Sequence, residues 1–167
     1  MGTRSMIGAV RPNGKVDVVY CHWDGYIEEP GVGWTLYTYW PTIQCARTLV
    51  AHGGMSSLGR ELGQKHDFND SNNDVTRNWC TFYRRDRGDK PDDEMICTYD
   101  TPAKMIQDHY AGAFNAAYAY LHTGHEWRVV AEDYTATPLR ELLIDPPRIV
   151  ARQRRRTHIP RAINWGD

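Results

Sequence analysis

The opening of the chain constrains the fold more than any other segment, because it has the pattern of a β-hairpin. A short apolar run over Ser5–Val10 is followed by the turn signal Pro12-Asn13-Gly14 and by a β-rich run over Val16–Trp23. Asn and Gly readily adopt the positive φ angles that tight hairpin turns require. The sequence therefore predicts two antiparallel strands at the N-terminal end.

The second strand of this hairpin is largely apolar on both faces. Side chains alternate along a strand, so the even-numbered residues from Val16 to His22 share one face. The odd-numbered residues from Val19 to Trp23 lie on the other face. A strand with one solvated face would alternate apolar and polar residues. We therefore expect a central strand that is covered on each side.

Patterns typical of helices and strands follow without strict alternation. Helical spacing is found at Thr42–His52, and a helix is expected from Pro102 to about Gly112, capped by Asp100 or Thr101. Shorter helical segments are expected at Trp34–Trp40 and Thr137–Leu143, and strands at Trp79–Tyr83 and Met95–Tyr99. The segments Gln64–Asn78 and Arg84–Glu94 have the composition of surface loops.

One stretch permits two interpretations. The alanines of Ala113–Leu121 favour a continued helix. The Tyr-rich end of this stretch, followed by His122-Thr123-Gly124, instead favours a hairpin with Glu126–Glu132. We favour the hairpin. The expected fold class is α+β, a mainly antiparallel sheet with two or three helices packed on it. Residues 1–145 form the expected single domain, and residues 146–167 a basic C-terminal tail.

Cysteine spacing and the lack of long apolar runs limit the protein class. The 4 Cys are irregularly spaced without a C-x-x-C pair, so no zinc site, metal or cofactor is expected. No signal peptide and no stretch of about 20 apolar residues is present, so we expect a protein of the cytoplasm that does not bind membranes. The motifs of P-loop, dinucleotide-binding, α/β-hydrolase and zinc-hydrolase proteins are also missing, which lowers the odds of an enzyme.

The C-terminal tail is strongly basic. It contains six arginines, and its one acid is Asp167, so it carries a charge of +5 and leaves about −6 on the rest of a chain whose net charge is −1. The cluster Arg152, Arg154, Arg155 and Arg156 could bind nucleic acid in a salt-sensitive way. Docking on the acidic body of the same or a neighbouring subunit is one alternative and a merely solvated extension is another, and a homo-oligomer is left open.

Several motifs resemble those of a family of small bacteriophage accessory proteins. The chain opens with MGTRS over residues 1–5 and carries YCHWDGY over residues 20–26. It also has an S-S-L-G turn over residues 56–59, Trp79-Cys80, and an R-D-R-G segment over residues 85–88. The resemblance implies a phage-encoded protein acting in the host cytoplasm, and it implies no particular reaction. The Arg-rich tail lies outside the family pattern.

The best candidate site gathers at the end of the hairpin. Arg4 precedes the first strand, and His22, Trp23, Asp24 and Tyr26 follow along the second, so an antiparallel hairpin brings them to one end. Arginine binds carboxylate and phosphate groups in a bidentate manner. This composition is typical of a pocket for a small anionic ligand. Hydrogen bonds that tie the strand end to its neighbours are the structural alternative.

Two further clusters are weaker candidates. Arg84, Arg85 and Arg87 could form an anion-binding rim, although the intervening Asp86 favours a solvated loop. His122 and His125 have a spacing that metal ligands also show, but a third ligand is not evident.

Three functions remain. The leading hypothesis is a non-enzymatic binding protein that modulates a host protein or sequesters a small host ligand. The second is a nucleic-acid-associated accessory protein that uses the tail. The third is a small hydrolase or nucleotide-processing enzyme in which the Asp24 carboxylate orients His22 as a general base.

Overall fold

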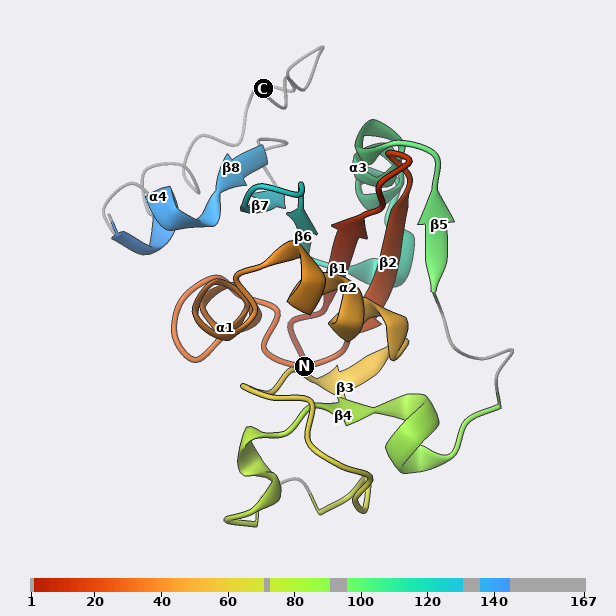
Figure 1. Ribbon diagram of the computed structural model, residues 1–167, viewed down its shortest axis with the longest axis vertical. Helices are drawn as coiled ribbons and strands as arrows, with labels where there is room; N and C mark the ends of the chain where they lie inside the picture. Colours follow the sequence, from red (N-terminus) through yellow and green to blue (C-terminus); the bar gives the residue numbers. More distant parts are fainter. Residues whose placement is uncertain (1, 71–72, 91–95, 131–135, 145–167) are drawn as a thin grey trace.

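A mixed sheet with helices on both faces forms the centre of the molecule (Figure 1). The structure, a computed structural model, describes residues 2–70, 73–90, 96–130 and 136–144. Its strands are β1 (Ser5–Val10), β2 (Val16–Cys21), β3 (Met55–Ser57), β4 (Thr81–Phe82), β5 (Cys97–Tyr99), β6 (Tyr118–His122), β7 (Trp127–Val130) and β8 (Ala136–Pro138). Its helices are α1 (Val32–Tyr39), α2 (Ile43–Ala51), α3 (Pro102–Tyr110) and α4 (Leu139–Ile144), with short turns η1 (Thr76–Asn78), η2 (Tyr83–Arg87) and η4 (Ala113–Asn115).

The predicted N-terminal hairpin is confirmed. β1 pairs antiparallel with β2 in a register that runs from Ser5 opposite Cys21 to Val10 opposite Val16. In the connecting turn Gly14 has a φ of 82°, a conformation that the Asn-Gly pair led us to expect. β2 is a central strand, because β1 lies on one side and both β3 and β5 pair on the other.

The prediction of a mainly antiparallel sheet is wrong, because the sheet is mixed. In the order β4-β3-β2-β1-β6-β7-β8, β1 runs parallel to β6, and β2 runs parallel to β3. Parallel neighbours need a long crossover connection, and α1 with α2 supplies one between β2 and β3. The sequence patterns revealed the strands joined by hairpins but not the crossovers. The described residues also form four α-helices rather than two or three.

The two faces of the sheet carry separate apolar cores. Helices α1, α2 and α4 cover the face that includes Ile7 and Val19, where Leu36 and Leu49 are fully buried. Helix α3 covers the opposite face and buries Met105 against strands β1, β2 and β6. The two apolar faces predicted for the second strand are therefore both covered.

Local signals place the helix starts and the last hairpin correctly. Thr42 caps α2 by accepting a hydrogen bond from the Cys45 amide, and Thr101 caps α3 by accepting one from the Lys104 amide. The ambiguous stretch resolves as the hairpin, since β6 pairs antiparallel with β7. Tail residues 146–167, and the domain boundary placed at residue 145, lie outside the described residues. Among those described, no helix is both long and apolar enough to span a membrane.

A buried ion pair fixes the chain beside β4. The Asp86 carboxylate accepts hydrogen bonds from the Phe82 amide at 2.7 Å, the His66 amide at 3.2 Å and the Arg85 guanidinium at 2.8 Å. Arg85 also donates to the carbonyls of Leu62 at 2.8 Å and Cys80 at 2.6 Å. The expected anion-binding rim is thus not formed by Arg85, whose guanidinium is occupied internally. This clamp holds the loop after β3 against the strand that precedes η2.

Removing the Arg85 side chain should strongly destabilise the protein. Arg85→Ala leaves the Asp86 carboxylate buried without its cation, and such a loss reduces the free energy of unfolding by about 3 kcal/mol or more. Urea denaturation measures it. Lys104→Ala, which breaks the exposed Lys104–Asp108 pair, is the control and should change stability by less than about 1 kcal/mol. Equal effects of the two variants would contradict the role of the clamp.

Stability should fall in mild acid because of His109. This α3 side chain is buried, its Nδ1 has no hydrogen-bond partner, and burial lowers its pKa from 6.5 to about 4. Between pH 6.5 and about pH 4, the His109 imidazole binds a proton in the unfolded chain but stays neutral in the folded protein. The free energy of unfolding should therefore drop by up to about 3 kcal/mol between these values. Denaturation of His109→Gln should show a flatter pH profile, whereas the exposed-site control His125→Gln should match the wild type.

Candidate functional site

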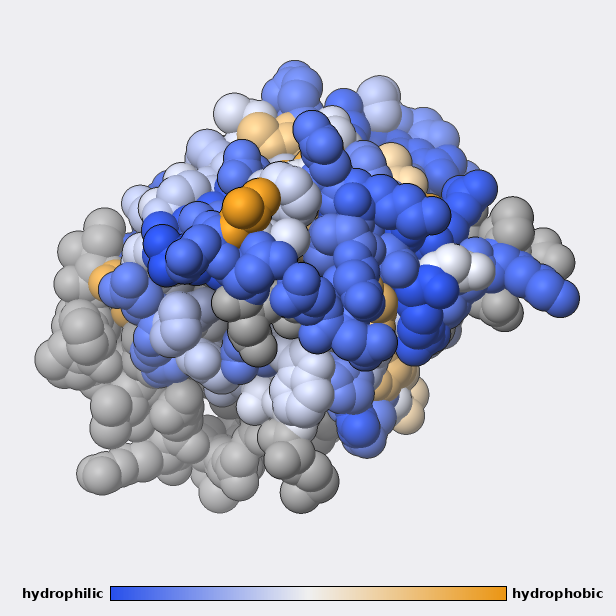
Figure 2. All heavy atoms as spheres, turned by 90° about the horizontal axis from the view of Figure 1, so that it is seen from below, coloured by the Kyte–Doolittle hydropathy of each residue, from blue (hydrophilic) through white to orange (hydrophobic). Residues whose placement is uncertain are grey.

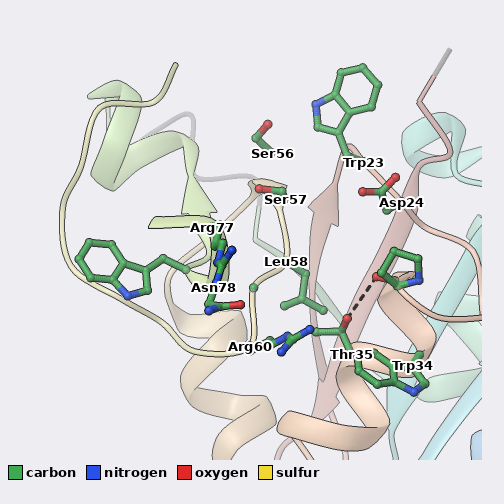
Figure 3. A pocket seen from close by; sticks show the side chains of 13 residues that line it. Trp23, Asp24, Trp34, Thr35, Ser56, Ser57, Leu58, Arg60, Arg77 and Asn78 are labelled. Carbon is green, nitrogen blue, oxygen red and sulfur yellow. Dashed lines mark hydrogen bonds between the residues drawn. The ribbon is translucent and has the colours of Figure 1, made fainter. Parts of the chain in front are cut away.

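A groove of about 830 Å³ opens beside the end of β2, where four separate segments of the chain meet (Figure 3). Ligand pockets for small molecules commonly have volumes of about 300–1,000 Å³. The groove is lined by Trp23, Asp24, Pro30, Trp34, Thr35, Ser56, Ser57, Leu58, Gly59, Arg60, Arg77, Asn78 and Trp79. It therefore collects the motifs YCHWDGY, S-S-L-G and Trp-Cys at one place on the molecule.

The end of β2 turns into the groove through a constrained backbone. Asp24 has a φ of 57°, and the Gly25 amide donates to the Thr3 carbonyl at 2.7 Å. A Cβ atom at Gly25 would lie only 2.7 Å from that same oxygen, so this position requires glycine. The buried Tyr120 hydroxyl donates to the Gly25 carbonyl at 2.8 Å. These contacts fix the direction in which Trp23 and Asp24 project.

The opposite wall is held by the S-S-L-G turn. The Gly59 carbonyl accepts a hydrogen bond from Trp40 Nε1 at 2.9 Å, and the Gly59 amide donates to Cys80 Sγ at 3.3 Å. Gly59 and Gly63 pack so closely on Trp79 that a Cβ at either would lie within 2.3 Å of it. The Arg85–Asp86 ion pair, which we call the clamp, also holds this loop through hydrogen bonds to the backbone of Leu62 and His66. The wall is therefore preformed rather than dependent on a ligand.

Aromatic rings and cations share the groove. Trp23 is 46% exposed, more than any other tryptophan that the structure describes, and lies beside Asp24 at the edge of the groove (Figure 3). The Arg60 guanidinium lies 6.0 Å from the ring centre of Trp34. Arg60 forms no ion pair with any described carboxylate, whereas Arg77 contacts the exposed Asp74 at 3.6 Å. The groove therefore offers cationic groups that are poorly neutralised by the protein itself.

The structure divides the predicted site instead of gathering it in one pocket. Trp23 and Asp24 line the groove, and Tyr26 lies close to Asp24 but is not among the lining residues. Burial and then the Asp24 charge raise the pKa of Tyr26. Arg4 and His22 are not among the residues that line the groove. The described residues show no ion pair between Arg4 and Asp24.

Arg4 and His22 belong to a polar cluster around Tyr20. The Tyr20 hydroxyl lies 2.6 Å from His22 Nδ1, and the Tyr20 ring stacks on Phe114, which packs against the α3-side core. Burial raises the pKa of Tyr20, and the nearby Arg4 guanidinium opposes that rise. Burial and then the Arg4 charge lower the pKa of His22. The hydrogen-bond partner of the imidazole is therefore a tyrosine, and the expected orienting role of Asp24 is not found.

The candidate site of the sequence analysis lacked all four of the other aromatic and cationic residues in the groove, namely Trp34, Arg60, Arg77 and Trp79. Trp34 was assigned only to a short helix, and Arg77 only to a surface loop. Arg60 directly follows the S-S-L-G turn and Trp79 belongs to the Trp-Cys pair, so both residues lie in or next to motifs that the sequence analysis had identified. What the sequence lacked was the parallel pairing of β2 with β3, which brings these segments beside Trp23.

The weaker candidates have structural roles where the structure describes them. The ring nitrogens of His122 lie 3.0 Å from the Pro41 carbonyl oxygen and 3.1 Å from the Gly124 amide, so neither is available to a metal. Arg87 pairs with Asp89. No group of three or more His, Cys, Asp or Glu side chains suited to a metal occurs in the described part. The tail arginines 152, 154, 155 and 156 lie outside it.

Comparisons of the chain with protein-family models, with curated proteins and with solved structures give no match. What the groove binds must therefore be inferred from its own lining.

Proposed function

We propose that the protein is a non-enzymatic binding protein that sequesters a small anionic ligand with an aromatic base, that is, a ligand of the nucleotide class. One observation carries the proposal. Three tryptophans and two arginines line a single groove whose volume suits such a ligand. This proposal keeps the ligand-sequestering form of the leading sequence hypothesis and gives the ligand a chemistry.

The aromatic side chains supply surfaces for a base. Trp23, Trp34 and Trp79 come from three different segments, and each contributes to the lining of the groove. Stacking of a nucleobase on an aromatic side chain contributes about 1–3 kcal/mol. Tryptophan offers the largest ring for this contact.

The cations supply contacts for a phosphate. Arg60 is free of ion pairs with described carboxylates, and the ion pair of Arg77 with Asp74 is exposed to solvent and weak. A guanidinium can donate two parallel hydrogen bonds to a phosphate. Ser56, Ser57 and Asn78 add further hydrogen-bonding groups, and the carboxylate of Asp24 can accept from a sugar hydroxyl or an exocyclic amine.

Binding rather than catalysis is favoured by the position of His22. The residue expected to act as a general base is not part of the groove lining, and its Nδ1 is engaged by the Tyr20 hydroxyl. A general base must lie within hydrogen-bond reach of the proton that it removes. A small ligand is also favoured over a protein partner by the face at the β3–β4 end, where hydrophilic side chains predominate and hydrophobic ones are isolated (Figure 2).

The phage context fits this proposal without being required by it. A phage accessory protein that removes a nucleotide from the host cytoplasm needs a preformed, high-affinity site and no reaction. The wall built by Gly59 and the Arg85–Asp86 clamp has this rigid character.

Mononucleotides should bind in the groove and quench tryptophan fluorescence. Titration with AMP, GMP, CMP and UMP should show saturation that weakens as salt rises, because phosphate binding is partly electrostatic. Trp34→Ala and Arg60→Ala should each reduce the affinity about tenfold or more. The matched control is Tyr37→Ala, which removes a 40% exposed aromatic side chain from the same helix without touching the groove. No saturation with any of the four, or full affinity in both groove variants, would refute the proposal.

A further inference from the structure

A second, shallower depression of about 560 Å³ lies next to the groove and shares two of its residues, Arg60 and Trp79. We call it the side hollow. Tyr39, Glu61 and Gln64 line the side hollow but not the groove. The two spaces are therefore separated by a wall that contains a cation and a tryptophan.

Arg60 lies between the aromatic groups of the two spaces. Its guanidinium is 6.0 Å from the ring centre of Trp34, which lines the groove, and 5.3 Å from that of Tyr39, which lines the side hollow. The Trp34 and Tyr39 rings themselves meet edge to face at 5.6 Å. Each space thus has an aromatic ring close to Arg60, and this guanidinium forms no ion pair with a described carboxylate.

The side hollow has the chemistry of a base site and not of a phosphate site. Glu61 contributes a carboxylate, which repels a phosphate but accepts a hydrogen bond from the exocyclic amine of a base. Gln64 adds an amide that can pair with a base edge, and Tyr39 an aromatic ring. Only Arg60, on the dividing wall, offers a full positive charge to both sides.

From this arrangement we infer that the ligand is a pair of nucleotides joined by a phosphodiester, with one base in the groove, the other in the side hollow and the bridging phosphate on Arg60. This inference rests on the proposed function and specifies its ligand. A mononucleotide fills only the groove. A dinucleotide stacks one base in each site and gains the contacts of both. It should therefore bind more tightly than a mononucleotide, although it carries less negative charge.

The direct test compares AMP with ApA, which has one phosphate like AMP, a lower charge and a second base. Calorimetric titration should show that ApA binds at least about tenfold more tightly than AMP. Tyr39→Ala should reduce ApA affinity to the level of AMP and leave AMP affinity unchanged, and Tyr39→Phe should retain most ApA affinity. An oligoadenylate of 12 nucleotides shows whether the natural ligand is a free dinucleotide or part of a longer strand. Tighter binding of the oligomer than of ApA identifies a strand segment, and equal or weaker binding identifies a free dinucleotide.

A second variant protects the test from a side effect of Tyr39→Ala on the neighbouring Trp34. Gln64→Ala alters only the side hollow and should weaken ApA about threefold without changing AMP binding. The two-base inference is overturned if ApA binds no more tightly than AMP, or if ApA still binds more tightly than AMP in both variants. In either case, binding of AMP still supports the proposed function. Failure of AMP and ApA alike overturns both.

Discussion

The burial of β2 on both faces is the constraint on which the rest of the structure depends. Val18 packs into the core beneath α3, and Val19 into the core beneath α1 and α2, so β2 must lie inside the sheet with covering helices on each side. A central strand needs neighbours on both edges, and β1 supplies only one of them. The crossover through α1 and α2 returns the chain so that β3 can pair beside the end of β2. This parallel pairing creates the groove, because it brings the S-S-L-G turn beside Trp23 and Asp24.

Rigidity and chemistry are supplied by different residues. The glycines of the groove wall permit close packing, and the Arg85–Asp86 pair holds that wall through hydrogen bonds to backbone groups. Arg85 and Asp86 are not among the residues that line the groove. The tryptophan rings and Arg60, which has no ion pair with a described carboxylate, then line a space whose shape is already determined. A preformed site lowers the entropy lost on binding, which fits the proposed capture of a ligand.

The sequence predicted local structure better than it predicted the site. The N-terminal hairpin, the Thr101 cap and the β6–β7 hairpin follow from turn residues and capping rules that act over a few positions. The parallel pairs β1–β6 and β2–β3 depend on contacts between distant segments, and no local pattern encodes them. For the same reason Trp23 and Asp24 were placed in a candidate site, whereas Arg60 and Trp79 were not. His22 and Arg4 come together as expected, but around Tyr20 and away from the groove.

The tryptophans allow the central claim to be tested at single residues. In a ¹⁵N NMR titration with AMP, the indole N–H signals of Trp23, Trp34 and Trp79 should shift together along one binding isotherm. The signal of Trp127 should stay in place, because its Nε1 is buried and donates to the Trp40 carbonyl at 2.7 Å. Shifts confined to tryptophans outside the groove, or none at millimolar AMP, would contradict the claim that this groove is a nucleotide site.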